Sequence, residues 1–356
     1  MSGREALSEP RVIAYVASWS VPAVIDTDKI THINFAFASI DASGKVSLTP
    51  QARASLQPLL ALRQKNARLK VLVSVGGWAA EGFSDAASTD ESRRTFARSA
   101  VELLREQSLD GIDLDWEYPG QGVAGIKFRP ADKQNFTSLL QTLREALNAQ
   151  SKARTTADKP SVPYLLTIAS ADREYFDHTE MQKLHVYLDW INVMTYDFFN
   201  SLTSTTGHHA GLYASPYAKP NDRNADASVK QHLGAGIPPE KIVLGVPFYG
   251  RGFNGVRAAR NGLNQTYEHY DTDYSYNELV EKLIDKQGFV RYWDERARAP
   301  YLWNSTSKAF ISYEDSHSLE AKTRYIKANG LGGIMLWELS QDRNGELLTV
   351  IDRGLR

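Results

Sequence analysis

Short apolar runs rich in β-branched and aromatic residues alternate along this chain with longer segments of helical periodicity. Eight runs predict strands, at residues 12–17, 32–38, 70–75, 109–117, 164–170, 188–196, 242–249 and 333–339. Leucines and other apolar residues recur three and four positions apart between many of these runs. This spacing predicts helices at residues 51–66, 91–106, 133–149 and 319–328. Strands that alternate with helices form a parallel sheet, and eight such units favour a TIM (β/α)8 barrel.

A doubly wound open sheet is the structural alternative. That fold usually carries a glycine-rich phosphate loop after its first strand. Residues 12–19 contain no glycine, so the pattern favours the barrel.

The regular alternation is interrupted after the seventh predicted strand. Residues 252–310 lack simple βα spacing, are rich in tyrosine and tryptophan, and contain one helical segment at 276–286. A connection of this length is normally folded, and in a barrel it would emerge at the C-terminal face. We therefore predict a small α+β insertion at 253–310, within a barrel formed by 10–252 and 311–353.

Charge and composition narrow the class of ligand. The chain has 356 residues, with 41 Lys and Arg against 42 Asp and Glu. This balance disfavours nucleic acid and anionic membranes as partners and suits a neutral ligand. There is no cysteine, and no apolar run approaches the roughly 18 residues of a membrane helix. The first ten residues lack the apolar core of a signal peptide, so the protein either stays inside the cell or has lost a leader.

The densest chemical signal is the run from Asp110 to Tyr118, which holds four carboxylates among apolar residues. In a strand, alternation places Asp113, Asp115 and Glu117 on one face. Adjacent carboxylates raise one another's pKa, so one of them is expected to hold a proton and serve as a general acid. The alternative is a solvated acidic loop. The apolar residues that alternate with the acids favour the strand.

The other predicted strand ends bring aromatic and polar side chains to the same end of a barrel. Sugar rings stack on aromatic faces, and their hydroxyls bond to Asp, Tyr and Arg, so this set predicts a carbohydrate site. The candidate substrate-binding residues are Tyr15, Phe37, Trp78, Tyr118, Met194, Asp197, Tyr249, Arg251 and Trp337, with Tyr196 as a further catalytic candidate.

Several of these motifs resemble glycoside hydrolase family 18, the chitinase family, in the subgroup with an α+β insertion. Residues 110–117 match its DxxDxDxE signature, 74–77 its SxGG motif and 194–197 its MxYD motif. The Tyr-Gly-Arg run at 249–251 and Trp337 also match. The resemblance covers roughly residues 11–342, and it implies hydrolysis of β-1,4 bonds between N-acetylglucosamine units of chitin.

The resemblance also implies a mechanism in which the N-acetyl oxygen of the substrate attacks the anomeric carbon. Glu117 would protonate the leaving oxygen and then act as base toward water. Asp115 would hold the acetamido N–H, and Asp113 would share a proton with it, so that the pair titrates as a unit. Tyr196 would hydrogen-bond the acetamido oxygen.

The remaining positions are substrate contacts in this resemblance. Asp197 and Arg251 would bind sugar hydroxyls, Trp337 would lie under the scissile sugar and Trp78 would stack on the leaving-group side. Many members with the insertion carry a tryptophan near the position of Leu202, and the connection 19–31 is short. Both departures weaken any expectation of processive action.

Two other functions stay open at this point. One is a related endo-β-N-acetylglucosaminidase acting on N-glycans or peptidoglycan, whose members often lack the insertion. The other is a non-catalytic chitin-binding lectin, a class that usually loses the acid at Glu117 or Asp115, both of which are present.

The remaining expectations concern metals, location and assembly. No metal or cofactor is expected. The adjacent His208 and His209 have no acid or cysteine close in sequence to complete a metal site, and a structural loop is favoured. Because chitin is extracellular, we expect the protein to act outside the cell, as a monomer.

Overall fold

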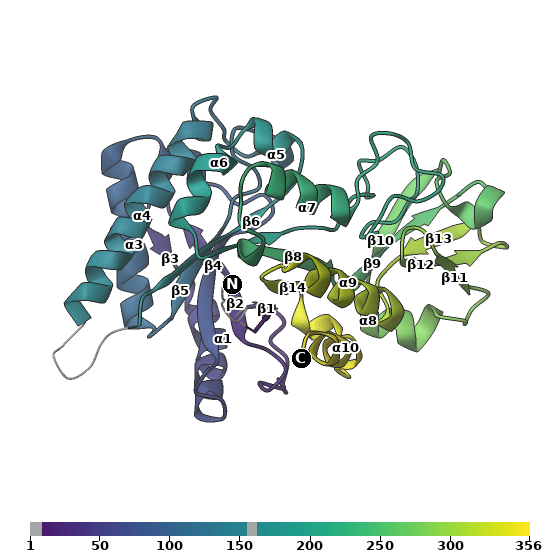
Figure 1. The fold of residues 1–356 in the computed structure, drawn as a ribbon, viewed down its shortest axis with the longest axis horizontal. Coiled ribbons are helices and arrows are strands. Elements are labelled where there is room, and N and C mark those ends of the chain that lie inside the picture. The colour runs from purple at the N-terminus through teal and green to yellow at the C-terminus, as the bar shows by residue number, and fades with distance from the viewer. Residues whose placement is uncertain (1–8, 155–161) are drawn as a thin grey trace, which may run out of the picture. The chain divides into compact units, whose positions relative to one another are not determined.

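The computed structural model describes residues 9–154 and 162–356 (Figure 1). Its strands are β1 (Arg11–Ala17), β2 (His32–Ile40), β3 (Val46–Ser47), β4 (Lys70–Gly76), β5 (Gly111–Asp115), β6 (Leu165–Ser170), β7 (Trp190–Val193), β8 (Ile242–Pro247), β9 (Tyr249–Asn254), β10 (His269–Ser275), β11 (Val290–Asp294), β12 (Ala299–Asn304), β13 (Ala309–Ser312) and β14 (Gly333–Trp337).

The helices lie between these strands. They are α1 (Pro50–Ala61), α2 (Phe83–Ala87), α3 (Asp90–Glu106), α4 (Asp132–Arg154), α5 (Glu174–Asp177), α6 (Met181–Leu184), α7 (Ala225–Gly234), α8 (Tyr276–Glu278), α9 (Ser316–Asn329) and α10 (Glu346–Leu355). Short 3₁₀ turns occur at Leu62–Gln64, Val123–Gly125, His185–Tyr187, Pro239–Lys241, Ala259–Gly262 and Leu339–Gln341, and a π-helical turn at Leu279–Leu283.

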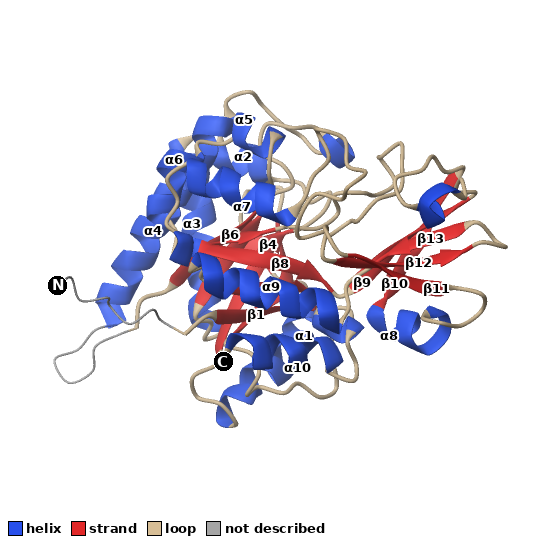
Figure 2. Cartoon of the chain, turned by 45° about the vertical axis from the view of Figure 1, so that its right-hand side comes forward, coloured by secondary structure: helices blue, strands red, loops and turns tan. Residues whose placement is uncertain are grey.

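Backbone hydrogen bonds order one sheet as β1-β14-β8-β7-β6-β5-β4-β2-β3, and β1 also pairs with β2. The β1–β2 pairing closes a barrel of eight parallel strands, with the two-residue β3 antiparallel to β2. The strands of this barrel alternate with helices along the chain, as Figure 2 shows. The predicted TIM (β/α)8 fold is confirmed.

The contacts within the chain divide it into two compact units, each of which is described here by itself. Unit 1 comprises the described parts of residues 1–14, 193–230 and 243–356. Unit 2 comprises the described parts of residues 15–192 and 231–242.

Unit 2 shows how local sequence forms the helices that cover the strands. Thr89 caps α3 in a capping box with Ser92, and Asp90 and Glu91 lie in the first turn, where acids favour the helix dipole. The apolar stripe of α3 then buries Phe96 and the residues that follow it at helical spacing. The polar residues at 89–92 therefore determine where the helix begins, and the apolar stripe determines which face of it is buried.

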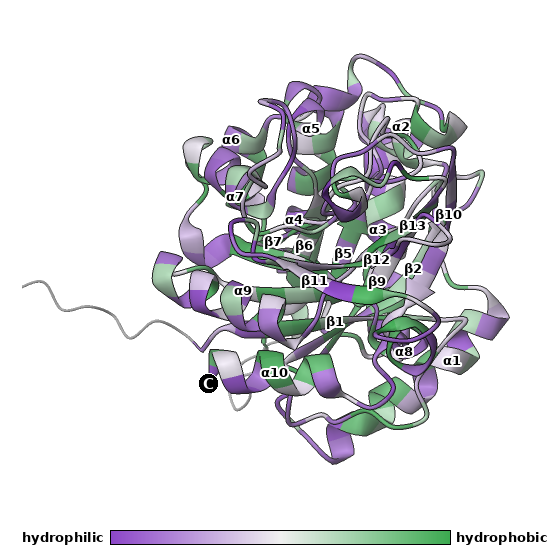
Figure 3. Ribbon diagram, turned by 90° about the vertical axis from the view of Figure 1, so that its right-hand side faces the viewer, coloured by the Kyte–Doolittle hydropathy of each residue, from purple (hydrophilic) through white to green (hydrophobic). Residues whose placement is uncertain are grey.

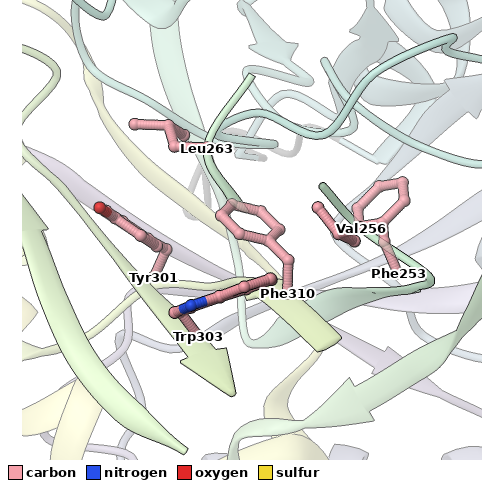
Figure 4. Close-up of a cluster of buried hydrophobic side chains, with 6 residues drawn as sticks. All are labelled: Phe253, Val256, Leu263, Tyr301, Trp303 and Phe310. Carbon is pink, nitrogen blue, oxygen red and sulfur yellow. The ribbon is translucent and has the colours of Figure 1, made fainter. Parts of the chain in front are cut away.

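Unit 1 contains a second sheet, antiparallel, in the order β10-β9-β13-β12-β11 (Figure 2). Figure 4 shows its core, where aromatic and aliphatic side chains from β9, β12, β13 and the β9–β10 connection pack together. The cluster comprises Phe253, Val256, Leu263, Tyr301, Trp303 and Phe310. This sheet lies between β8 and α9 along the chain and begins at Tyr249, earlier than the predicted insertion. The limits 253–310 and a role as a cleft wall stay predictions.

Helix α10 ends unit 1 and is amphipathic. It buries Leu347, Leu348, Ile351 and Leu355, and Figure 3 shows hydrophilic and hydrophobic residues along it. Among the described residues, no helix combines the length and the apolar character needed to cross a membrane.

Four predicted strands run past the C-terminal end of the observed strand. Strand 333–339 ends at Trp337, because Glu338 is the N-cap of the 3₁₀ turn that follows. Strand 109–117 ends at Asp115, because its partner β4 ends at Gly76 and Gly77 turns away with φ 93°. Strand 188–196 ends at Val193, because the N–H of Thr195 donates to the Val193 carbonyl in a tight turn. Strand 242–249 ends at Pro247, and Tyr249 already belongs to β9.

The predicted helix at 276–286 is also wrong as a single regular element. The structure has the one-turn α8 followed by a π-helical turn that ends at Leu283. Asp285 takes φ 56°, in the left-handed region, which stops the helix before residue 286.

The packing of Trp116 provides a test of the unit 2 core. Its ring stacks on Phe83 with centroids 5.2 Å apart and meets Phe136 edge-on at 5.4 Å, and the side chain is 1% exposed. We expect Trp116→Ala to lower the free energy of unfolding by about 3–5 kcal/mol, because it leaves a cavity among these rings.

Urea unfolding followed by circular dichroism measures the change, and Trp19→Ala is the matched control because Trp19 is 69% exposed. Equal losses in the two variants would contradict the central place of Trp116 in this core.

Candidate active site

The end of β5 in unit 2 carries the acidic run. All five residues of β5 are buried, and Asp113 and Asp115 point to the same face of the strand. Glu117 lies two residues beyond the strand and is half-buried. The acids therefore run from the buried interior of unit 2 toward its surface.

The SxGG segment is shaped by its approach to this strand. The N–H of Gly77 donates to the Asp115 carbonyl at 2.9 Å. A Cβ on Gly76 would lie 2.1 Å from that carbonyl oxygen, and one on Gly77 would lie 2.7 Å from the ring of Phe37. Both glycines also have φ in the left-handed region, at 118° and 93°. Only glycine fits these two positions, which explains the paired glycines of the motif.

Asp113 is fully buried and accepts four side-chain hydrogen bonds. Tyr15 and Ser74 donate to its Oδ2 at 2.7 Å each, and Thr167 and Asn192 donate to its Oδ1 at 2.6 and 3.1 Å. Burial raises the pKa of Asp113, and these four donors oppose the rise without cancelling it. Four donors on one carboxylate fix its position and orientation.

Asp115 has a different environment two residues on. It is 5% exposed, and its buried Oδ1 has no hydrogen-bond partner in the described part of the chain. Burial raises the pKa of Asp115 well above its usual range, and the charges of Glu117 and Asp113 raise it further. The carboxyl therefore favours its protonated form, as neighbouring acids are expected to do.

Aromatic rings surround the acids within unit 2. Trp78 is 56% exposed, and its ring meets that of Tyr118 edge-on at 6.4 Å. Tyr118 meets the buried Tyr175 at 6.2 Å, and Trp19 lies 6.3 Å from Phe37. Exposed rings such as Trp78 and Trp19 offer flat apolar faces for stacking.

Two of these aromatic positions differ from the sequence interpretation. Tyr15 is 2% exposed, and its hydroxyl supports Asp113 within the core. Tyr175, which the sequence analysis missed, has its pKa raised by burial and by the charges of Asp115, Asp113 and Glu117. Its place shortly after β6, at a strand end, was the signal that could have found it.

The other predicted residues belong to unit 1. Asp197 follows β7 with φ 60° and receives two bonds of 2.6 Å from Arg251, in a bidentate pair. The hydroxyl of Tyr249 also donates to Asp197 at 2.6 Å. Partial burial acts to raise the pKa of Asp197, but the neighbouring His209 and Arg251 outweigh it and hold that pKa well below its usual range. Asp197 is thus a fixed anion.

Three further candidates lie in unit 1. Met194 directly follows β7 and is half-buried, and the hydroxyl of Tyr196 points to the sulfur of Met335 at 3.8 Å. Trp337 ends β14 and is also half-buried. Leu202 is 78% exposed and offers no ring for stacking.

The fold brings one acid close in space to each of the two adjacent histidines. The chain brings Asp294 to 3.1 Å from the Nε2 of His208, and Asp197 to 3.6 Å from the Nδ1 of His209. Each histidine faces a single carboxylate, and no group of three metal-ligating side chains occurs among residues 9–154 and 162–356.

Comparison with known proteins agrees with this geometry. Residues 11–342 match the family model described as glycosyl hydrolases family 18. The chain belongs to this family. The acidic run at β5 lies within the matched residues.

Individual relatives extend the comparison. The chain is 39% identical to chitinase A1 of Niallia circulans over 96% of its own length, and it spans 58% of that relative. Among solved structures, it is similar to a family 18 N-acetylglucosaminidase from Paenibacillus barengoltzii, with TM-score 0.89, 42% identity and coverage of 97% of this chain and 99% of that one. It is also similar to the Ostrinia furnacalis Group IV chitinase solved with allosamidin, with TM-score 0.87, 30% identity and coverage of 98% and 99%.

The raised pKa of Asp115 predicts a pH-dependent stability effect. The folded-state pKa lies above the unfolded value of about 3.9, so folded protein holds more protons than unfolded protein between the two values. The stability that Asp115 contributes is fully present below the unfolded pKa and is lost as the pH rises through the folded pKa. We expect Asp115→Asn to gain stability relative to the wild type as the pH rises from about 4 to 7.

Urea unfolding of both proteins across this pH range measures the difference. Asp41→Asn is the control, because hydrogen bonds from Ser43 and Lys45 lower the pKa of the exposed Asp41. The stability that Asp41 contributes is lost only as the pH falls below about 4, so the difference between this variant and the wild type should stay nearly constant as the pH rises from about 5 to 7. A difference between Asp115→Asn and the wild type that stays constant with pH would rule out a raised Asp115 pKa.

Proposed function

We propose that this chain is a retaining chitinase that hydrolyses β-1,4 bonds between N-acetylglucosamine units of chitin and chito-oligosaccharides. The observation that carries the proposal is the end of β5, where Glu117 lies half-buried beyond two buried acids, one of which has a strongly raised pKa. Family 18 enzymes use the N-acetyl group of the substrate in place of an enzyme nucleophile. A single acid with supporting carboxyls is the set that this chemistry requires.

The proposed steps assign each acid a different role. Glu117 protonates the glycosidic oxygen as the acetamido oxygen attacks the anomeric carbon and the glycosidic C–O bond breaks. The resulting carboxylate then takes a proton from a water molecule, whose oxygen attacks the anomeric carbon and displaces the acetamido oxygen. Asp115 receives the acetamido N–H, for which its unpartnered Oδ1 is suited. Asp113, fixed by four donors, keeps Asp115 in place and exchanges a proton with it. The acidic run thereby orients the reacting group and stabilises the positive intermediate.

The unit 1 residues supply binding in this proposal. Tyr196 hydrogen-bonds the acetamido oxygen, and the Asp197–Arg251 pair binds sugar hydroxyls with charges that are already fixed. Trp78, Tyr118 and Trp337 provide stacking faces for sugar rings. We further propose that no cofactor takes part, and that the protein acts outside the cell as a monomer, which light scattering and fractionation of the source culture would test.

A second candidate within the same chemistry is an N-acetylglucosaminidase that releases single sugars. It is favoured by the 42% identity to the Paenibacillus barengoltzii enzyme, which bears that name and which this chain covers almost completely. Product lengths distinguish the two candidates. Initial products of two to four units from chitin hexasaccharide indicate a chitinase, whereas a monosaccharide and a pentasaccharide as the initial products indicate the second candidate.

The central test combines product analysis with stereochemistry. We expect cleavage of chitin hexasaccharide, with the β-anomer formed first in the NMR spectrum, and no cleavage of fully deacetylated chitosan hexasaccharide. Equal cleavage of both substrates would contradict substrate assistance, because chitosan lacks the attacking acetamido group.

Variants of Glu117 test the assignment of the acid. We expect Glu117→Gln to reduce hydrolysis by about 10³–10⁴, the upper end for a general acid because one residue serves both steps. Binding of the hexasaccharide, measured by calorimetry, should stay within about threefold of the wild type, since the amide keeps the shape of the side chain.

Glu145→Gln, at an exposed position of helix α4, is the matched control and should hydrolyse normally. Turnover by Glu117→Gln within about tenfold of the wild type would refute the assignment.

A further inference from the structure

His209 is a buried histidine beside the Asp197–Arg251 pair, with no role in the proposal above. Its side chain is fully buried, and its Nδ1 lies 3.6 Å from Oδ1 of Asp197. Neither ring nitrogen makes a hydrogen bond within the described part of the chain. The ring also packs against that of Tyr249, with centroids 5.4 Å apart. An unpartnered polar ring in this place calls for a function, because burying it costs free energy.

Two hydrogen bonds hold the backbone of His209 beside the segments that carry Asp197 and Arg251. Its carbonyl accepts a hydrogen bond from the N–H of Phe198, the residue after Asp197, at 3.0 Å. Its N–H donates to the hydroxyl of Ser312 at 2.9 Å, and Ser312 is the β13 residue opposite Arg251 in the sheet. The histidine is therefore tied to the segment that carries Asp197 and to the strand beside Arg251.

The charges around the ring favour its neutral form. Burial lowers the pKa of His209, Asp197 opposes this effect, and the cations Arg251 and Lys322 add to it, with a net fall. The neighbouring Tyr249 donates to Asp197 and carries no charge at neutral pH. A neutral imidazole still has one N–H to donate, and Asp197 Oδ1 is the acceptor that its Nδ1 faces.

We infer that His209 is a positioning residue that holds Asp197 against Arg251 and Tyr249 so that the carboxylate can bind sugar hydroxyls. This inference rests on the proposed function, in which Asp197 contacts substrate. The 3.6 Å separation is about 0.6 Å longer than a normal N–H···O bond, and active-site bonds of this kind shorten when the site is engaged. His209 acts through Asp197 and does not itself touch the reacting atoms.

The adjacent His208 provides a matched control within the same loop. It is also buried, but its Nε2 bonds to Asp294 at 3.1 Å, and Asp294 accepts further bonds from Ser215 and from the N–H of Ala297. These hydrogen bonds involve neither Asp197 nor Arg251. His208 thus has the same residue type and burial without the proposed role.

The test compares three substitutions in the full chain, with chito-oligosaccharide hydrolysis as the assay. We expect His209→Phe, which keeps a ring but no nitrogen, to raise KM about tenfold while kcat changes less than about threefold, because Asp197 binds ground and transition states alike. His209→Gln keeps a neutral donor and should restore KM to within about threefold. His208→Phe should lower the melting temperature and leave KM unchanged.

Two results would overturn the inference: an unchanged KM in His209→Phe, or equal impairment of KM in His209→Phe and His209→Gln. If His209→Phe does not fold, His209→Leu supplies the same comparison. The Glu117→Gln variant separates the two proposals, because failure of that protein to bind chito-oligosaccharide defeats the proposed function and this inference together. If Glu117→Gln binds chito-oligosaccharide normally and His209→Phe has an unchanged KM, the inference about His209 is wrong and the proposed function stands.

Discussion

The arrangement at the end of β5 depends on one constraint, the burial of charged carboxyls beside one another. Asp113 and Asp115 lie within a strand that is buried throughout, where an ionised carboxylate is costly unless hydrogen bonds or a proton compensate it. Asp113 is compensated by four donors from four different segments of unit 2. The buried Oδ1 of Asp115 has no donor among residues 9–154 and 162–356, and the raised pKa of Asp115 favours a proton instead. Burial therefore gives Asp113 and Asp115 different environments, and the roles proposed for them rest on that difference.

Unit 1 solves the opposite electrostatic problem. Asp197 is stabilised as an anion by a bidentate arginine, by the hydroxyl of Tyr249 and by a buried histidine. Its pKa is held low, whereas that of Asp115 is held high. Carboxyls whose environments push their pKa values apart are assigned different tasks in enzymes, and here the tasks proposed are binding and proton exchange.

The protein fold explains why these residues occur where they do. The paired glycines at 76–77 permit a close approach to the Asp115 carbonyl, and no side chain could replace their hydrogen atoms. Tyr15 lies at a buried position of β1, and its hydroxyl donates a hydrogen bond to Asp113. Supporting contacts of this kind set the orientation of the acids more strictly than the strand alone would.

The hydrophobic pattern by itself predicted the eight barrel strands, the helices α1, α3, α4 and α9, and the barrel class, because periods of two and near four residues follow from backbone geometry. It did not predict the strands of the second sheet. The acidic run also predicted a general acid, since like charges alternating with apolar residues have few structural uses, and the roles of its members stay predictions. Strand ends could not be predicted to the residue. Where β5 stops depends on where its partner β4 stops, and the paired ends Gly76 and Asp115 are 39 residues apart in sequence.

The tertiary structure alone decided which groups surround each acid. Nothing in the sequence near Asp113 indicates Thr167 or Asn192, and nothing near His209 indicates that Asp197 and Arg251 lie beside it. The same limit led sequence reasoning to find no acid for the adjacent histidines and to overlook Tyr175. Hydrogen bonds and charge interactions depend on distance in space, and folding brings together residues whose separation along the chain carries no information about that distance.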